Sequence, residues 1–213
     1  MSYITFGRTR TSAYGFIVAP YEIPVPPVQT NYVEVPGRNG SLDLSEAFGA
    51  VRYGDRVINL TLYAVGDYAQ SVSEFVNDVH GKRMRIEFDK DPDYFYTGRV
   101  SVSAIEKRDG YCAIGLEIIA EPYKLDTMET TVTKEGNGRV SLQNGSMPVT
   151  PVIRTTAETS LRFTYNGSSM TVTLSAGTHT VPQLTLAANQ TLSVTVSVTG
   201  IGTTSFIYRK GWL

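Results

Sequence analysis

The side chains that most often carry catalysis or bind metal ions are scarce in this chain. Its 213 residues include one cysteine, Cys112, and two histidines, His80 and His179, which stand far apart. A single thiol excludes an intrachain disulfide and a thiolate zinc site. A nucleophilic cysteine needs a nearby histidine and an electropositive pocket, and the sequence around Cys112 offers neither. We expect Cys112 to be a buried, inert thiol and His80 to lie at the end of a helix.

The acidic run Asp-Lys-Asp-Pro-Asp at residues 89–93 has the aspartate spacing with which a calcium loop begins. An EF-hand loop then needs glycine at its sixth position and glutamate at its twelfth, where this chain has Tyr94 and Val100. A solvated turn between strands is the better interpretation. The sequence also lacks a Walker A loop, a Rossmann glycine pattern and a G-x-S-x-G elbow. We therefore predict no enzyme activity, no cofactor and no metal site.

Charge and composition exclude further classes of protein. The chain has 19 Lys and Arg against 20 Asp and Glu, for a formal net charge of −1. The chain therefore has no strong positive electrostatic field to attract a polyanion, and we do not expect nucleic-acid recognition. No apolar run approaches the roughly 18 residues of a membrane span, and we expect no membrane insertion and no signal peptide. The aromatic run at residues 94–96 could stack on a sugar, although packing in a core or interface is the commoner role.

The secondary-structure elements that must position any functional site fall into two parts of the chain. Charged side chains become scarce after about residue 140, while threonine and serine become abundant. Two turn-rich clusters, at residues 135–138 and 143–146, mark the change. We predict an N-terminal domain over residues 1–135 and a C-terminal domain over residues 136–213.

The N-terminal domain is predicted to be mostly strands. Residues 83–88 alternate strictly, with Met84, Ile86 and Phe88 on one face, which is typical of a half-buried strand. Residues 57–65 alternate in the same way. Asp109-Gly110 separates two further apolar runs and predicts a hairpin with a type I′ turn.

One helix is predicted over about residues 67–80. Its apolar residues follow the spacing i, i+3, i+4, i+7 and are Val72, Phe75, Val76 and Val79. Asp67 is placed to cap the helix, with Gln70 in the capping-box position, and Gly81 is placed to end it. A single helix among strands must bury its apolar face on a sheet. We therefore predict a β-sandwich or open barrel with one packed α-helix.

The C-terminal domain is predicted to be all β. Asn166-Gly167 joins two alternating runs, residues 161–165 and 168–174, into a hairpin. Residues 191–199 alternate valine and leucine with serine and threonine. Together with shorter strands at 152–155, 178–181 and 204–209, this predicts a small β-sandwich of the jelly-roll type.

Two stretches of the N-terminal domain do not have the pattern of ordinary strands. The proline-rich residues 20–27 cannot form a regular ladder and should run extended. Residues 38–55 follow Gly37 and contain three further glycines, at 40, 49 and 54, with neither strand nor helix periodicity. The apolar residues scattered among them are Leu42, Leu44, Ala47 and Phe48. Such a segment is either a short helix or Ω-loop packed on its own domain, or an arm that buries its apolar residues on a neighbouring subunit.

Several stretches together resemble the distal tail proteins of long-tailed bacteriophages (siphophages). They are Ala-Tyr-Gly-Phe at residues 13–16, the proline stretch, Val-Glu-Val-Pro-Gly-Arg-Asn-Gly-Ser-Leu-Asp-Leu at 33–44, Tyr-Gly-Asp-Arg-Val-Ile-Asn-Leu at 53–60, Ala-Glu-Pro-Tyr-Lys at 120–124, and Tyr-Arg-Lys-Gly-Trp-Leu at 208–213. The Val-Pro-Gly-Arg-Asn-Gly stretch is the most specific. The resemblance covers about residues 1–125 and the final strand.

The resemblance implies a structural protein at the distal end of the phage tail, made in the host cytoplasm. Six copies would form a ring between the tail tube protein and the tail-associated hub protein. The C-terminal domain would be a galectin-like sandwich that supports a receptor-binding protein or binds a cell-surface saccharide. An arm of each subunit would clasp its neighbour. Our candidate interface residues are Arg38, Leu42, Leu44, Phe48 and Tyr53.

Two alternative interpretations assign the chain to other classes of protein. The C-terminal sandwich could make the chain a stand-alone carbohydrate-binding protein acting in host-surface recognition, or it could carry an enzyme on a jelly-roll scaffold. Near-zero net charge limits repulsion among six copies, and a chain poor in His and Cys fits a structural protein better than an enzyme.

Overall fold

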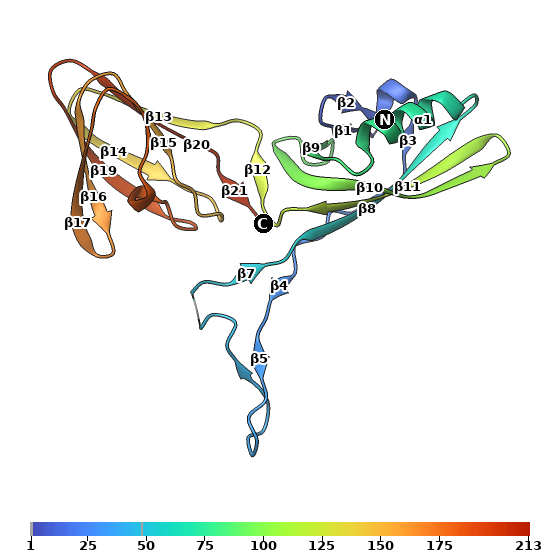
Figure 1. Cartoon of the computed structure of the whole chain (residues 1–213), viewed down its shortest axis with the longest axis horizontal. Coiled ribbons are helices and arrows are strands. Elements are labelled where there is room, and N and C mark those ends of the chain that lie inside the picture. Colours follow the sequence, from blue (N-terminus) through green and yellow to red (C-terminus); the bar gives the residue numbers. More distant parts are fainter. Residues whose placement is uncertain (1, 48) are drawn as a thin grey trace. The chain divides into compact units, whose positions relative to one another are not determined.

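The computed structural model describes residues 2–47 and 49–213 (Figure 1). It is mainly β, as predicted, with one α-helix among the described residues. The chain divides into two compact units, Met1–Lys124 and Leu125–Leu213. This boundary lies earlier than the predicted one at residues 135/136. The reason is that the turn at 135–138 joins β13 (Thr130–Glu135) to β14 (Gly138–Gln143) inside the second unit, where the chain passes from one sheet to another.

The first unit is built on an antiparallel sheet with the strand order β2-β1-β9-β10-β11-β8-β3. Its strands are β1 (Ile4–Phe6), β2 (Thr9–Arg10), β3 (Ile17–Val18), β8 (Arg56–Val65), β9 (Arg83–Phe88), β10 (Tyr94–Arg108) and β11 (Tyr111–Ala120). A short 3-10 helix, η1 (Thr11–Tyr14), joins β2 to β3. The predicted alternation is confirmed, since β8 buries Ile58, Leu60, Leu62 and Ala64 and β9 buries Ile86 and Phe88.

The β10–β11 hairpin is confirmed, but its turn differs from the prediction. Arg108 pairs with Tyr111, so Asp109 and Gly110 form the two-residue loop. A type I′ turn needs positive φ at both positions. Gly110 has a φ of 81°, whereas Asp109 does not adopt positive φ. The turn is therefore not type I′.

The α-helix α1 (Ala69–Val79) packs its predicted stripe on the sheet and buries Val72, Phe75 and Val79. The Phe75 ring meets Phe6 and Phe16 edge-on, with centroids 5.8 and 5.2 Å away. Gly81 follows the helix with a φ of 74°, as predicted. The predicted cap at its start is wrong.

The residue that precedes the first turn of α1 is Tyr68, and it makes no side-chain capping bond. Asp67 lies one position too early to act as the cap. The Gln70 side chain donates instead to Glu74, 2.8 Å away and one turn further along the helix. The capping-box pattern in the sequence therefore reflects an i,i+4 pair on the exposed surface.

The second unit is a sandwich of two four-stranded antiparallel sheets, ordered β13-β20-β15-β18 and β14-β19-β16-β17. The further strands are β15 (Val152–Thr155), β16 (Thr159–Tyr165), β17 (Ser168–Leu174), β18 (Gly177–Thr180), β19 (Thr191–Val198) and β20 (Thr203–Tyr208). The chain alternates between the sheets and stays in one sheet only across the β16–β17 hairpin. This is jelly-roll connectivity, as the sequence predicted.

The core between these two sheets is separate from the core of the first unit. Leu192, Val194, Val196 and Val198 of β19 are all buried in it, which confirms the predicted alternation. A 3-10 helix, η2 (Pro182–Leu184), adds Leu184. In the β16–β17 turn, Asn166 and Gly167 have φ of 48° and 77°, so both positions are positive, as a type I′ turn requires.

The last residues of the chain return to the start of the second unit. Strand β21 (Gly211–Trp212) pairs with β12 (Lys124–Asp126). The Trp212 indole donates to the Asp126 carboxylate at 2.7 Å, and the Arg209 guanidinium donates to the carbonyls of Asp126 and Thr127. These bonds hold the C-terminus in place.

Candidate functional site

The most unusual feature of the first unit is a long two-stranded excursion between β3 and β8, which we call the arm and define as residues 28–53 (Figure 1). Two short ladders hold its two chains together. Strand β4 (Val28–Gln29) pairs with β7 (Arg52–Tyr53), and β5 (Tyr32–Val33) pairs with β6 (Leu42–Asp43). Neither ladder joins the main sheet. The arm is preceded by residues 20–27, which run extended without strand pairing, as predicted.

The arm exposes apolar side chains over much of its length. Every residue from 28 to 43 is exposed. The large apolar residues among them are Val28, Tyr32, Val33, Val35 and Leu42. The register places Val33 opposite Leu42, so these two side chains share one face of the ribbon, while Tyr32 lies opposite Asp43 on the other. Val33 and Leu42 therefore form an exposed apolar pair on one face of the ribbon, and exposed apolar area of this kind suits an interaction surface.

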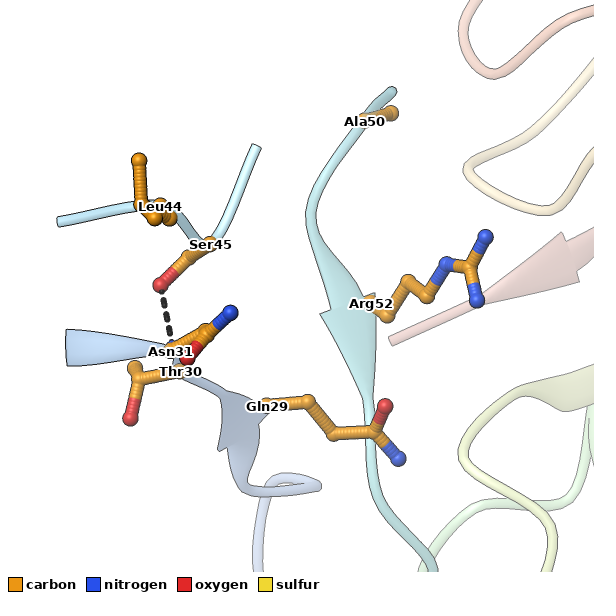
Figure 2. A pocket seen from close by; sticks show the side chains of 7 residues that line it. All are labelled: Gln29, Thr30, Asn31, Leu44, Ser45, Ala50 and Arg52. Atoms are coloured by element: carbon orange, nitrogen blue, oxygen red, sulfur yellow. Dashed lines mark hydrogen bonds between the residues drawn. The ribbon is translucent and has the colours of Figure 1, made fainter. Parts of the chain in front are cut away.

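Between the two ladders the chains of the arm separate and enclose a hollow of about 390 Å³ (Figure 2). Its lining residues are Gln29, Thr30, Asn31, Leu44, Ser45, Ala50 and Arg52. The hollow is bridged near β5, where the Asn31 backbone N–H donates to Ser45 Oγ at 2.8 Å and the Leu44 N–H donates to the Asn31 carbonyl at 2.8 Å. These hydrogen bonds join the two chains of the arm again beyond the hollow.

Ser45 also binds the carboxylate of Asp43. Its hydroxyl and its backbone N–H both donate to Asp43 Oδ1. These two hydrogen bonds favour the carboxylate and lower the pKa of Asp43 below its usual value. Asp43 is therefore ionised at neutral pH, and it sets a negative charge beside Tyr32 on one face of the ribbon.

The root of the arm is anchored by a buried arginine. Arg56, the first residue of β8, is only 3% exposed. Its guanidinium donates to the Pro24 carbonyl, just before the arm, and to the Pro122 carbonyl at 2.9 Å, just after β11. The same group lies over the Tyr96 ring, 5.4 Å from its centroid. Burial lowers the pKa of Arg56, yet a guanidinium remains charged at any ordinary pH.

A second contact at the root comes from Tyr53. Its ring meets Tyr123 edge-on, with 6.0 Å between centroids. The backbone N–H of Gly54 donates to the Pro27 carbonyl at 2.8 Å. The arm is thus held where it leaves the sheet, while the backbone hydrogen bonds of its outer half, among the described residues, all stay within the arm.

The structure places the predicted interface residues at different levels of the arm. Arg38 lies in the exposed outer turn, and Leu42 lies on β6. Leu44 is half-buried beside the hollow. Tyr53 packs on Tyr123 of its own unit, so only part of its surface is free. Phe48 lies outside the described residues, and the interface role of all five stays a prediction.

Sequence reasoning recognised only the second half of the arm. Residues 38–55 were predicted as an irregular segment, whereas residues 28–37 form the matching first half with Tyr32, Val33 and Val35. The signal for that half is the alternation Val33-Glu34-Val35 before a Pro-Gly turn. Arg56 was also missed, although it occupies an inward position in the alternation of β8.

The other candidate residues are engaged in packing. Cys112 is buried, and burial raises the pKa of its thiol, which makes it a poor nucleophile. His80 lies at the end of α1, where its Nδ1 accepts from the Val102 N–H at 3.0 Å. Phe95 and Tyr96 are buried, so residues 94–96 do not form an open platform for a sugar ring.

The acidic run at residues 89–93 is likewise occupied by partners in the fold. Asp89 accepts hydrogen bonds from the hydroxyls of Ser2 and Tyr21, each at 2.7 Å. Asp91 accepts from Tyr96 at 2.7 Å and from Lys124 at 3.0 Å. Among the described residues, no group of three or more His, Cys, Asp and Glu side chains is arranged to hold a metal ion. In residues 2–47 and 49–213, no helix has the length and apolar character needed to cross a membrane.

The fold of this chain matches a solved structure over nearly its whole length. The chain is similar to the crystal structure of the SPP1 Dit (gp 19.1) protein, described as a paradigm of the hub adsorption apparatus in phages that infect Gram-positive bacteria. The TM-score is 0.68, and the match covers 98% of this chain and 99% of that one. Sequence identity is 14%, so the likeness shows the fold. No family model matches the sequence, and no curated protein matches it.

Proposed function

We propose that this chain is a structural protein of a phage tail tip that assembles as a homohexameric ring. The ring joins the tail tube protein on one face to the tail-associated hub protein on the other, at the distal end of the tail in the virion. Support comes from the likeness over the full chain to a phage protein of the hub adsorption apparatus. A role as a scaffold rather than an enzyme agrees with the inert environment of Cys112 and the engaged carboxylates of residues 89–93.

The observation that carries the proposal is the exposed arm. Val33, Val35 and Leu42 keep 41%, 40% and 37% of their surface accessible. Fully burying a valine or leucine side chain contributes about 1.5–3 kcal/mol, so covering the remaining surface contributes about 0.6–1.2 kcal/mol for each. Three such residues give roughly 2–4 kcal/mol at every contact between copies. An arm that reaches a neighbour makes a heterologous contact, and such contacts close into a ring when the rotation allows it.

The test compares the unmodified full-length chain with the double variant V33D/L42D. Sedimentation and negative-stain images of the unmodified chain should show six-fold rings with a central hole. The double variant should sediment as a folded monomer, because two carboxylates on the shared face cannot be buried without a large desolvation cost. A control is I201D, which places one carboxylate at a fully exposed residue outside the arm and should leave assembly unchanged.

Two results would overturn the proposal. One is an unmodified chain that remains monomeric at tens of micromolar. The other is a V33D/L42D variant that forms the same rings as the unmodified chain, since this would remove the arm from the interface.

The alternative, a carbohydrate-binding protein that recognises a host surface, would place function in the jelly-roll unit. That unit also offers the surface from which a receptor-binding protein or a cell-surface saccharide would be held in the ring. In this unit the charged side chains, rather than the aromatic ones, decide which ligands can bind.

A further inference from the structure

The outer face of the β14-β19-β16-β17 sheet has an unusual composition. Two arginines, Arg139 on β14 and Arg162 on β16, occupy outward positions in the alternation of their strands. Every other outward-facing residue of these four strands is serine, threonine or glutamine. A carboxylate is therefore absent from this described face. The opposite sheet differs, because Glu135 lies on its outer face.

The two arginines lie in one row across the sheet. Arg139 pairs in register with Thr195 of β19, and Arg162 pairs with the same Thr195 from the other side. Neighbouring strands are about 4.8 Å apart, so the two Cα atoms are separated by on the order of 10 Å. Side chains as long as arginine can then present both guanidinium groups to the same groove.

Both guanidinium groups are available for a ligand. No ion pair joins Arg139 or Arg162 to a carboxylate in the described part of the chain. Arg162 donates from Nε to Ser169 Oγ of β17 at 2.9 Å, which holds the side chain on the β17 side of the groove and leaves its two terminal nitrogens free to donate into it. Both arginines line one groove of about 600 Å³, together with Thr164, Ser193 and Thr195.

The chemistry of the groove selects among ligands. A planar guanidinium binds phosphate or carboxylate oxygens in bidentate fashion, and two of them favour an anion strongly. The second unit as a whole carries six Lys and Arg against four Asp and Glu, although the complete chain is at −1. No aromatic side chain is exposed in the groove, since Phe163 is buried, so neither a neutral sugar ring nor a nucleic-acid base finds a surface to stack on.

We propose that this groove binds a phosphodiester-linked polyol or sugar polymer, with Arg139 and Arg162 contacting its phosphates from the two sides of the groove and the surrounding hydroxyls contacting the polymer between them. The groove is open and crosses several strands, which suits an extended polymer better than a small enclosed ion. The hydroxyl groups of serine and threonine can both donate to and accept from the hydroxyls of a polyol. This proposal concerns the jelly-roll unit alone and does not depend on the arm or on ring formation.

The test measures binding of the full-length chain to immobilised poly(glycerol phosphate) at low ionic strength. We expect binding that weakens as salt is added and that falls at least tenfold in the double variant R139S/R162S. The matched control is R154S, which removes one arginine from the outer face of the opposite sheet and should change binding less than twofold. Trp212 fluorescence checks that each variant keeps the fold of the second unit.

Competition experiments distinguish the source of the phosphate. Soluble poly(glycerol phosphate) should displace the chain at far lower phosphate concentration than glycerol 3-phosphate or inorganic phosphate. The proposal is overturned if the unmodified chain does not bind, or if R154S loses as much affinity as the double variant. It is also overturned if neutral dextran or an oligothymidylate of equal phosphate number competes as well as the polymer.

Discussion

Replacing Arg56 by methionine tests whether a buried guanidinium fixes the root of the arm. Arg56 is almost fully buried and donates to two carbonyls, those of Pro24 and Pro122, that lie on either side of the arm's attachment. Methionine keeps most of the side-chain volume but has no donor, so both carbonyls lose their partner. A buried acceptor left without a hydrogen bond costs about 1–3 kcal/mol.

Leaving both carbonyls without a partner costs about 2–6 kcal/mol of folding free energy. Removing the buried charge offsets part of this, because a guanidinium out of water carries its own desolvation cost and the Nε of Arg56 already lacks a partner. We therefore expect R56M to lower the free energy of unfolding of the first unit by about 2–4 kcal/mol. At an m-value of about 2 kcal/mol per molar urea, the midpoint should fall by about 1–2 M.

Urea unfolding of the full-length chain can separate the two units. The only tryptophan, Trp212, belongs to the second unit, so its fluorescence follows that unit, while far-UV circular dichroism follows both. R56M should move the first-unit transition and leave the Trp212 midpoint in place. R154M, at an exposed arginine of the second unit, is the matched control and should change neither midpoint appreciably. A shift below about 0.5 kcal/mol in R56M would refute the anchoring role.

Three further outcomes follow from the packing and the turns. Burial and the hydrogen bond to Asp78 raise the pKa of Tyr14 to about 12, so the stability that Tyr14 contributes is complete below about pH 10 and lost as pH rises towards 12; the alkaline fall measured by urea unfolding should be smaller in Y14F. F75A should lower first-unit stability by about 3–5 kcal/mol, seen by circular dichroism, because it leaves a cavity under α1. G167A should lower the Trp212 midpoint by the equivalent of about 1–2 kcal/mol, because alanine is strained at a φ of 77°.

Strands with one buried face could be predicted from the sequence, and strands without one could not. In β8, β9 and β19 the core requires an apolar residue at every second position, so the alternation is visible in the sequence. The arm strands are two residues long and exposed on both faces, so no core imposes a pattern on them. For that reason the first half of the arm was missed.

Local turn and cap signals were reliable only where nothing competed with them. Asn166-Gly167 adopts positive φ at both positions, while in Asp109-Gly110 only the glycine does. Asparagine tolerates the left-handed region better than most residues, which explains part of the contrast. At the start of α1, the chain enters the helix one residue later than Asp67 indicates, and the cap is lost.

The residues of the candidate site also divide into those that the sequence predicts and those that it does not. Leu42 was predicted from its apolar character inside a glycine-rich segment, and it is exposed on β6. Arg56 was not predicted, because the need for its charge arises from two proline carbonyls distant in sequence. The Arg139–Thr195–Arg162 row also needed the register of three strands, which no local pattern in the sequence contains.

The position of the last long strand has a consequence for biosynthesis. Strand β20 lies between β13 and β15 in the interior of its sheet, so the jelly-roll unit cannot complete its core until residues 203–208 have left the ribosome. The strands from β1 to β11 that form the main sheet of the first unit are complete by Ala120, so this sheet can form while the second unit is still being synthesised. The arm is therefore attached to a folded sheet before the second unit has folded.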